Sequence, residues 1–367
     1  MSDDIVELSA YELSAECFRR EALRPNRPAV IRNAGELMLR NAQFNDLVQH
    51  PEQLVSIFGE AALCVTICSY GEDGLQQQSA EMTLDEIMQS WSSSKDDQIY
   101  LKDVHLQQLM EEKGYTGLYE VPDFLGGDWL SAFQLSRKKL LNDDLPRFGM
   151  GDDYRFLYAG PSNATWTPFH FDVFGSYSWS LNVRGTKTWY FAKMSECQKL
   201  YDEFPAHRPR PSDMRTARYA DGTPVGTTRF LQKPGDLVFV PSCYFHQVHN
   251  GDDSVQPSGE QPLCISINHN WCNEYNIVRM CQLLADECRV AEQMVDDEVV
   301  AMMKADDTWG PTVESMLRGS GAWTVAAMEA LLEFAESVNG SDACREALVQ
   351  SRVILHNIRS QWQQPAF

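Results

Sequence analysis

The 367-residue sequence contains no long apolar run, no closely paired cysteines and no excess of positive charge. No stretch approaches the roughly 18 uninterrupted apolar residues of a membrane-spanning helix. The N-terminus reads Met-Ser-Asp-Asp and lacks the basic and apolar regions of a signal peptide. We therefore expect a protein of the cytoplasm or the nucleus that does not insert into a membrane.

The ten cysteines are scattered, and no two of them form a C-x-x-C pair. Cys64 and Cys68 have no second Cys or His pair nearby to complete a zinc site, so we expect both to be reduced thiols in the core. The chain also has neither a Gly-x-Ser-x-Gly nucleophile elbow nor a glycine-rich phosphate loop. Nothing in these patterns indicates catalysis by a nucleophilic side chain.

Acidic residues outnumber basic ones by 52 to 31, which gives a net charge of −21. Such a charge repels phosphate backbones and anionic lipids, so binding to nucleic acid or to a membrane surface is disfavoured. A basic peptide or protein is electrostatically the easier partner. The alternative is that the charge serves solubility alone.

Apolar periodicity predicts strands first and helices later. From residue 276 onward the spacing is helical, and two apolar stripes are predicted to make core or dimer contacts. The expected strands are residues 29–31, 61–69, 98–103, 153–158 and 237–240, and the expected helices include 84–91 and 277–294. The stripes are Met328, Leu331, Leu332 and Ala335, and Leu348, Leu355, Ile358 and Trp362.

Residues 177–191 alternate between polar and apolar side chains. Ser178, Ser180 and Asn182 share one face of the expected strand, and Trp179, Leu181 and Val183 share the other. Gly185 permits a turn, so the segment is predicted to form a β-hairpin. Lys233-Pro-Gly-Asp236 is typical of a type II turn. Between them, the Arg- and Pro-rich residues 195–228 are expected to form an excursion between core strands, either a solvated loop or a basic functional one.

Three residues form a candidate metal site. His170 and Asp172 are two residues apart, so on an extended strand both side chains point to one face. His246 follows the predicted strand 237–240. Two imidazoles and one carboxylate leave half an octahedron open, which is the facial triad of non-haem Fe(II) oxygenases. His249 and His269 are alternatives for the third ligand, but His249 is an odd number of residues from His246 and would face away.

Such a triad needs an electron source, which in one large class is 2-oxoglutarate. Its far carboxylate requires a cation inside the fold. Lys187 lies in an otherwise apolar predicted strand, where an anionic partner would offset its desolvation. Thr167 is a candidate hydroxyl donor to the same ligand, and further candidate polar contacts are Ser178, Ser180, Asn182 and Asn268.

Five segments together resemble the Jumonji C family of oxygenases. They are residues 154–161, 166–172, 178–189, 238–250 and 264–271, and the resemblance extends over about residues 20–280. Within the family, the chain is most similar to a branch associated with lysyl hydroxylation of the eukaryotic translation termination factor. It departs from the family at Cys243 and Tyr244, where Gly-Trp is more usual before the distal histidine.

The resemblance implies a fold that is mainly β with additional α-helices. Its core would be a double-stranded β-helix (jelly roll) at residues 141–275. An N-terminal α/β region, 1–140, and a C-terminal helical region, 276–367, flank this core. It further implies Fe(II) held by His170, Asp172 and His246, and 2-oxoglutarate held by Lys187 and Thr167. With O2, these would hydroxylate a lysine in a protein substrate, the release factor, by hydrogen abstraction with release of succinate and CO2.

Other functions use similar residues. A histone lysyl demethylase has the same centre, but this chain lacks the paired Cys/His zinc reader modules of many chromatin demethylases. A binding-only member of the fold would be expected to have lost a ligand, and all three are present. A zinc hydrolase with the same ligands would have no need of Lys187 and Thr167. A homodimer through the C-terminal helices is a further expectation.

Overall fold

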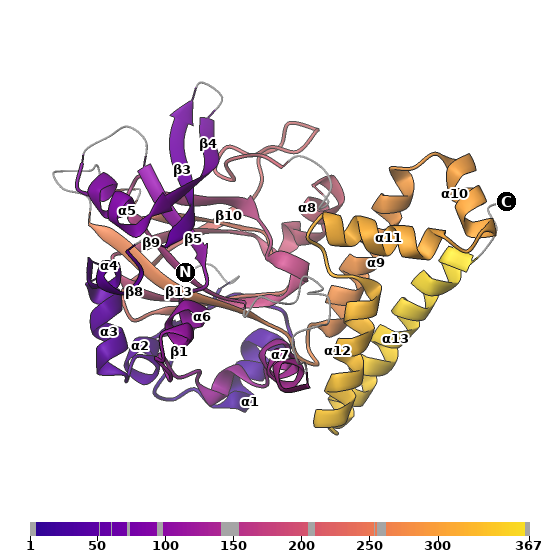
Figure 1. The fold of residues 1–367 in the computed structure, drawn as a ribbon, viewed down its shortest axis with the longest axis horizontal. Coiled ribbons are helices and arrows are strands. Elements are labelled where there is room, and N and C mark those ends of the chain that lie inside the picture. Colours follow the sequence, from indigo (N-terminus) through magenta and orange to yellow (C-terminus); the bar gives the residue numbers. More distant parts are fainter. Residues whose placement is uncertain are drawn as a thin grey trace.

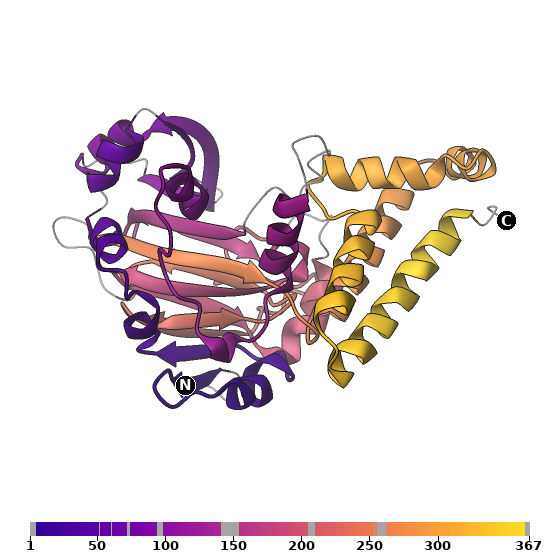
Figure 2. The same ribbon diagram turned by 60° about the horizontal axis from the view of Figure 1, so that its bottom comes forward.

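The computed structural model describes residues 5–363 apart from 51, 60, 72–73, 94–97, 141–153, 205–209, 253 and 255–261, and only the backbone of 56–58 and 137–140. Two mainly antiparallel sheets form its centre. Indigo N-terminal helices pack beside the strands, and the orange and yellow C-terminal helices lie at one end of them (Figure 1). Figure 2 shows the same C-terminal helices as a layer of their own.

Eight strands wind between the two sheets. Strands β6, β13, β8 and β11 are neighbours in the larger sheet, and the smaller sheet has the order β10-β9-β12-β7. This is a double-stranded β-helix, a form of jelly roll, as the sequence predicts. The strands are β6 (Arg155–Pro161), β7 (Trp166–His170), β8 (Tyr177–Arg184), β9 (Lys187–Ala192), β10 (Thr227–Gln232), β11 (Leu237–Val240), β12 (His246–Asn250) and β13 (Leu263–Trp271).

The N-terminal region adds strands to both edges of the larger sheet. On one edge, β1 (Val6–Ser9) and β2 (Ala29–Arg32) follow β11. On the other edge, β5 (Gln98–Val104), β3 (Ala62–Gly71) and β4 (Gly74–Thr83) follow β6. The predicted strands are thereby confirmed, although the strand expected at 153–158 begins at Arg155, and residue 153 lies outside the described residues. Helix α5 (Leu84–Trp91) matches its prediction and begins with a capping box between Thr83 and Glu86.

The prediction of a hairpin at residues 177–191 is wrong. β8 belongs to the larger sheet and β9 to the smaller one, so the chain crosses between sheets at Gly185. Gly185 has φ +72°, and a Cβ there would lie 2.8 Å from the Leu263 carbonyl oxygen. The turn at residues 233–236 is confirmed by the hydrogen bond from the Asp236 amide to the Lys233 carbonyl, 3.1 Å, and it too connects the two sheets. Alternation therefore predicted the faces of the strands but not their partners.

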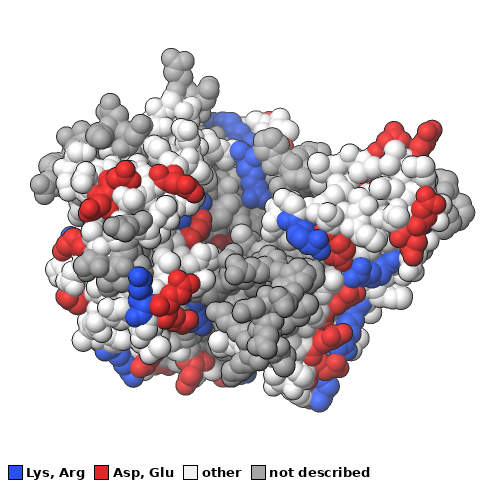
Figure 3. Space-filling view, viewed as in Figure 1, with Lys and Arg blue, Asp and Glu red and all other residues white. Residues whose placement is uncertain are grey.

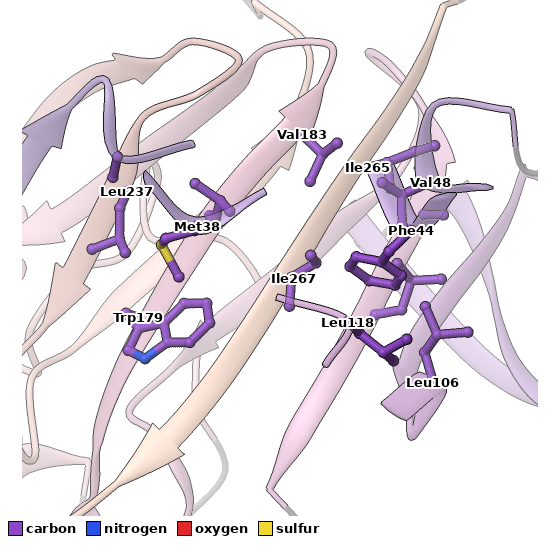
Figure 4. Close-up of a cluster of buried hydrophobic side chains, with 14 of the residues drawn as sticks. Met38, Phe44, Val48, Leu106, Leu118, Trp179, Val183, Leu237, Ile265 and Ile267 are labelled. Carbon is purple, nitrogen blue, oxygen red and sulfur yellow. The ribbon is translucent and has the colours of Figure 1, made fainter. Parts of the chain in front are cut away.

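The outer face of the larger sheet carries a hydrophobic core. Trp179, Leu181 and Val183 of β8 point into it, as predicted, and Figure 4 shows Trp179 and Val183 with Ile265 and Ile267 of β13. The N-terminal helices cover this face with Met38, Phe44 and Leu106, among others. These helices are α1 (Ala15–Phe18), α2 (Ala34–Met38), α3 (Ala42–Gln49), α4 (Glu52–Phe58), α5 and α6 (Leu106–Glu112), whereas α7 (Trp129–Leu140) packs with the C-terminal helices. The polar face of β8 is thus left to the interior of the barrel.

Five C-terminal helices form a second core. Both predicted stripes are buried in it, so they make core contacts within one chain. The helices are α9 (Ile277–Gln293), α10 (Asp297–Ala305), α11 (Trp309–Gly319), α12 (Val325–Val338) and α13 (Asp342–Gln363). Basic and acidic side chains alternate along the lower right of Figure 3, where Figure 1 shows α12 and α13. Arg352 of α13 pairs with Glu336 of α12, and Arg359 pairs with Glu329. None of the described helices is both long and apolar enough to cross a membrane.

The Arg- and Pro-rich segment between β9 and β10 folds back onto the smaller sheet. It contains α8 (Cys197–Glu203), and its Met214, Tyr219 and Val225 are buried against that sheet. Residues 205–209 lie outside the described residues. The Arg210 guanidinium lies 4.4 Å from the centre of the Phe171 ring. A solvated loop is therefore the wrong description of this segment's described part.

One cysteine prediction is also wrong. Cys68 is buried, but Cys64 is exposed. β5 pairs with β3 only over Val65–Cys68, so Cys64 lies beyond it, on a ribbon that has only β4 beside it.

Candidate metal centre

The structure brings His170, Asp172 and His246 together. His170 ends β7, His246 begins β12, and the two residues are direct partners across the smaller sheet. Their ring centres lie 4.2 Å apart. His170 Nε2 is 3.9 Å from Asp172 Oδ1, and one ligand atom from each residue lies within 4.8 Å of the others. At these separations, side-chain rotations are enough to bring all three ligand atoms onto one ion.

Backbone carbonyls orient both imidazoles. His170 Nδ1 donates to the Pro168 carbonyl at 2.7 Å, and His246 Nδ1 donates to the Tyr244 carbonyl at 2.9 Å. Because a carbonyl only accepts, each Nε2 is left with its lone pair toward the site. Burial is the main cause that holds the pKa of His170 well below its usual value, and the electrostatic effect of the nearby His246 is the second. The imidazole is therefore neutral, the form that binds a metal.

A hydroxyl fixes the carboxylate ligand. Ser178 Oγ donates to Asp172 Oδ2 at 2.6 Å, which leaves Oδ1 toward the two histidines. Ser178 is on the polar face of β8, so the alternation of that strand delivers it to the metal site. Ser178 therefore orients a ligand, and because it also lines the cavity, its contact to the co-substrate stays a prediction.

The two alternative histidines lie elsewhere. His249 is buried beside Trp166, and its Nε2 is 2.6 Å from the Gln247 amide nitrogen. His269 Nε2 is 3.0 Å from Asp128 Oδ2, on the outer side of the larger sheet against Trp179. Neither joins the cluster of ligands. The odd spacing from His246 was thus the correct argument against His249.

Lys187 is buried in the same cavity as the three ligands. The cavity lies between the sheets. The ammonium is 2 % exposed, donates to Ser266 Oγ and lies 5.6 Å from the centre of the Tyr158 ring. Burial lowers its pKa to about 8. No carboxylate of the described residues pairs with it, so a bound anion would stabilise the charged form.

The cavity contains most but not all of the other predicted contacts. Thr167, Ser178 and Asn268 line it. Ser180 lies behind Asn268 and donates to its Oδ1 at 2.9 Å. Asn182 is buried away from the cavity, where its amide donates to the Gly185 carbonyl at 2.7 Å. Asn182 therefore stabilises the crossover turn and does not face the site.

The sequence reasoning missed four polar residues at the site. Asn270 lines the cavity, and Ser266 accepts from Lys187. Both are an even number of residues from Asn268 on β13, so strand periodicity could have identified them. Tyr158 and Tyr100 also line the cavity, and the Tyr100 hydroxyl bonds to Thr167. No local pattern distinguishes these two tyrosines from core residues, because they come from strands β6 and β5.

The donor set and the buried cation fit Fe(II) and a dicarboxylate in one cavity. Two imidazoles and a carboxylate suit a non-haem iron with open positions. The unpaired ammonium of Lys187 suits the far end of 2-oxoglutarate. A double-stranded β-helix with this site defines the class of iron- and 2-oxoglutarate-dependent oxygenases. The particular family within that class follows from comparison with known proteins.

Residues 156–260 match the model of the JmjC domain, described as a hydroxylase. The chain is 33% identical to the 2-oxoglutarate and iron-dependent oxygenase JMJD4 of Mus musculus over 67% of this chain and 55% of that protein. It is 34% identical to the JMJD4 homolog of Drosophila melanogaster over 70% of this chain and 52% of that protein. The chain belongs to the JmjC-domain family, and it is similar to the JMJD4 branch that its motifs resemble.

A third relative covers more of the chain. The Arginine-specific demethylase JMJ20 of Arabidopsis thaliana is 28% identical over 95% of this chain and 76% of that protein. By contrast, the chain spans about half the length of the JMJD4 relatives.

Proposed function

We propose that this protein hydroxylates a lysine of a protein substrate, and that the substrate is the eukaryotic translation termination factor. The observation that carries the proposal is the placement of three metal ligands and a buried, unpaired lysine around one cavity. The choice of substrate follows from the resemblance of the sequence motifs to a branch associated with hydroxylation of that factor. The net charge of −21 favours a basic partner over nucleic acid or membrane, and the substrate would be met in the cytoplasm.

In this proposal His170, Asp172 and His246 hold the iron, and Lys187 with Thr167 holds the co-substrate. When bound, iron, 2-oxoglutarate and dioxygen supply the oxidation of an unactivated carbon, with succinate and CO2 as the other products. The chain's own contribution is positional. Backbone carbonyls fix the imidazoles, Ser178 fixes the carboxylate, and the buried walls of the cavity exclude water.

Demethylation is the second candidate. The Arabidopsis relative is named an arginine-specific demethylase, and its similarity extends over nearly the whole chain. The same centre would oxidise an N-methyl carbon of arginine or lysine, after which formaldehyde would leave. Product mass separates the two reactions, because hydroxylation adds one oxygen while demethylation removes a methyl group.

The test combines the purified protein, Fe(II), ascorbate and 2-oxoglutarate with a termination-factor peptide that contains the target lysine. Methyl-arginine and methyl-lysine peptides are assayed in parallel. Succinate release with a gain of one oxygen on lysine supports the proposal, and the His246→Ala variant serves as the inactive control. Loss of a methyl group with no oxygen gain on any lysine would contradict hydroxylation and support demethylation. Iron loading without either product would contradict both.

A further inference from the structure

An open groove leads from the metal centre to the C-terminal helices. It has a volume of about 900 Å³, and Asp172 lines both this groove and the cavity of the metal site. One wall comes from the metal loop, residues 171–174, and from Tyr201 of α8. The opposite wall comes from α9 and α11. A substrate segment that reaches the metal through this groove therefore lies against α9.

Helix α9 places Glu287 at the inner part of the groove. Leu283 is packed with the apolar side chains of the smaller sheet, and a Cβ on Gly175 of the metal loop would lie 3.2 Å from its Cδ2 atom. Glu287 is four residues later on the same helical face, about 6 Å further along the axis. Burial is the main cause of the raised pKa of the Cys243 thiol, and the negative charges of Glu287 and Asp172 raise that pKa further. Glu287 thus lies near the residues that border the metal ligand.

The other acidic groups of the groove already have partners. Asp286 accepts hydrogen bonds from Arg289 and from the Tyr201 hydroxyl. Asp202 accepts from Gln198 at 2.9 Å. The basic Arg210 also lines the groove; its guanidinium lies over the Phe171 ring, and its Nε has no hydrogen-bond partner among the described residues.

Glu287 differs from them. Among the described residues none donates a hydrogen bond to its carboxylate or forms an ion pair with it, and burial alone raises its pKa to about 7. A half-buried carboxylate without a partner binds a cation more strongly than a solvated one does, since part of its desolvation cost is already incurred in the free protein.

We propose that Glu287 binds a lysine or arginine side chain of the substrate segment and so positions that segment at the entrance to the metal centre. This inference rests on the proposed action on a protein substrate and names a residue that determines specificity. Charge complementarity selects the occupant. The groove meets the metal cavity at Asp172, and Glu287 is its carboxylate without a partner among the described residues. Its walls carry apolar side chains for the stem of a long basic residue.

Binding should depend on pH in a defined direction. At pH 6 the Glu287 carboxyl is mostly protonated and at pH 8 it is mostly ionised, because burial raises its pKa to about 7. A cationic segment therefore binds more tightly as the pH rises through 7. The charged and titratable groups that face Glu287 are Asp286, Cys288 and Arg289 on α9, Tyr201 on α8, Arg210 on the segment before β10, Cys243 before β12 and Asp172 on the metal loop.

The experiment measures the kinetics and binding of the termination-factor peptide with Glu287→Gln, and with Glu333→Gln as a matched loss of an exposed carboxylate on α12. Each flanking basic residue of the peptide is also replaced in turn by norleucine. We expect Glu287→Gln to raise KM roughly 10- to 100-fold with a much smaller change in kcat, and to remove the rise in affinity between pH 6 and 8. One of the norleucine peptides should bind the wild type as weakly as the parent peptide binds Glu287→Gln. The affinity of that norleucine peptide should fall little further when it is measured with Glu287→Gln.

An unchanged KM for Glu287→Gln would overturn the inference, as would an equal penalty for every norleucine peptide. Glu287→Asp should restore part of the affinity, and circular dichroism should show both variants folded. Peptide binding is also measured by fluorescence anisotropy without turnover. Binding that depends on Glu287 without hydroxylation would contradict the proposed reaction alone, whereas hydroxylation that is indifferent to Glu287 would contradict this inference alone.

Discussion

The buried ammonium of Lys187 reduces the stability of the empty protein. In the folded state its pKa is about 8, below the usual 10.5. A group with a lowered pKa binds fewer protons in the folded state, so its cost to stability is fully present below pH 8 and disappears as the pH rises toward 10.5. A residue that destabilises the fold at neutral pH is retained where it serves a ligand.

Replacing Lys187 by Met should therefore separate stability from function. We expect the unliganded variant to be more stable than the wild type at pH 7 by roughly 1–3 kcal/mol, and this gap to narrow toward pH 10. The same variant should lose the thermal stabilisation that 2-oxoglutarate gives to the metal-loaded wild type. Chemical denaturation at several pH values and melting with and without the co-substrate check both expectations. Lys193→Met, which removes an exposed lysine at the end of β9, should show neither effect.

Ser178 should matter through the ligand that it holds. Its hydroxyl donates to Asp172 Oδ2, and hydrogen bonds of this kind to a ligating carboxylate orient it toward the metal. Ser178→Ala should weaken Fe(II) binding about 10- to 100-fold in anaerobic titrations. Ser180→Ala, which instead removes a bond to Asn268, should leave the metal affinity within a few-fold of the wild type. Equal losses in the two variants would contradict an orienting role.

For single residues, most correct predictions came from the spacing of side chains along one strand. The pair His170 and Asp172 follows from strand periodicity, and Lys187 follows from an isolated charge in an apolar strand. Tyr100 could not be placed, because its position in the cavity depends on β5 pairing with β6. Asn182 was misplaced because it shares a strand face with Ser178 but lies at the far end, beside the crossover turn.

Secondary-structure elements were predicted better than their pairing. The prediction for α5 matches its observed bounds, and that for β11 does as well, because capping residues and apolar runs are local signals. The partner of a strand depends on how the chain crosses between sheets. Two adjacent strands with a glycine between them suggest a hairpin, yet here the glycine carries the chain from one sheet to the other.

Gly185 should accordingly be intolerant of substitution. Its φ is +72°, and an added Cβ would lie 2.8 Å from the Leu263 carbonyl oxygen and 2.9 Å from Cys264 Cα. We expect Gly185→Ala to lower the free energy of unfolding by roughly 2–4 kcal/mol, which combines backbone strain with a clash against β13. Gly222→Ala is the matched control, since its φ is +81° but nothing lies within 4 Å of the new Cβ. It should cost about 1 kcal/mol in the same denaturant titration.

The whole molecule joins the barrel to the C-terminal helices beside the metal site. Trp323, between α11 and α12, donates to the Tyr154 hydroxyl at 3.0 Å and contacts Phe174, with ring centres 5.5 Å apart. Tyr154 precedes β6, and Phe174 is two residues after Asp172. The second core also includes Cys272, directly after β13. Near residue 276 the sequence therefore changes from strand-like to helical periodicity, but the second core contains residues from both sides of this boundary.

Trp323→Ala tests whether the two parts unfold as one unit. Removing a buried tryptophan should cost roughly 3–5 kcal/mol, and the loss should appear equally in the helical signal and in the near-ultraviolet signal of the barrel. Because Trp323 packs on Phe174, Fe(II) binding should also weaken in anaerobic titration at a temperature where the variant remains folded. Met302→Ala, an exposed change on α10, controls for a general effect of the helices. Two separate transitions, with iron affinity unchanged, would mean that the helical region is an appendage and does not support the metal loop.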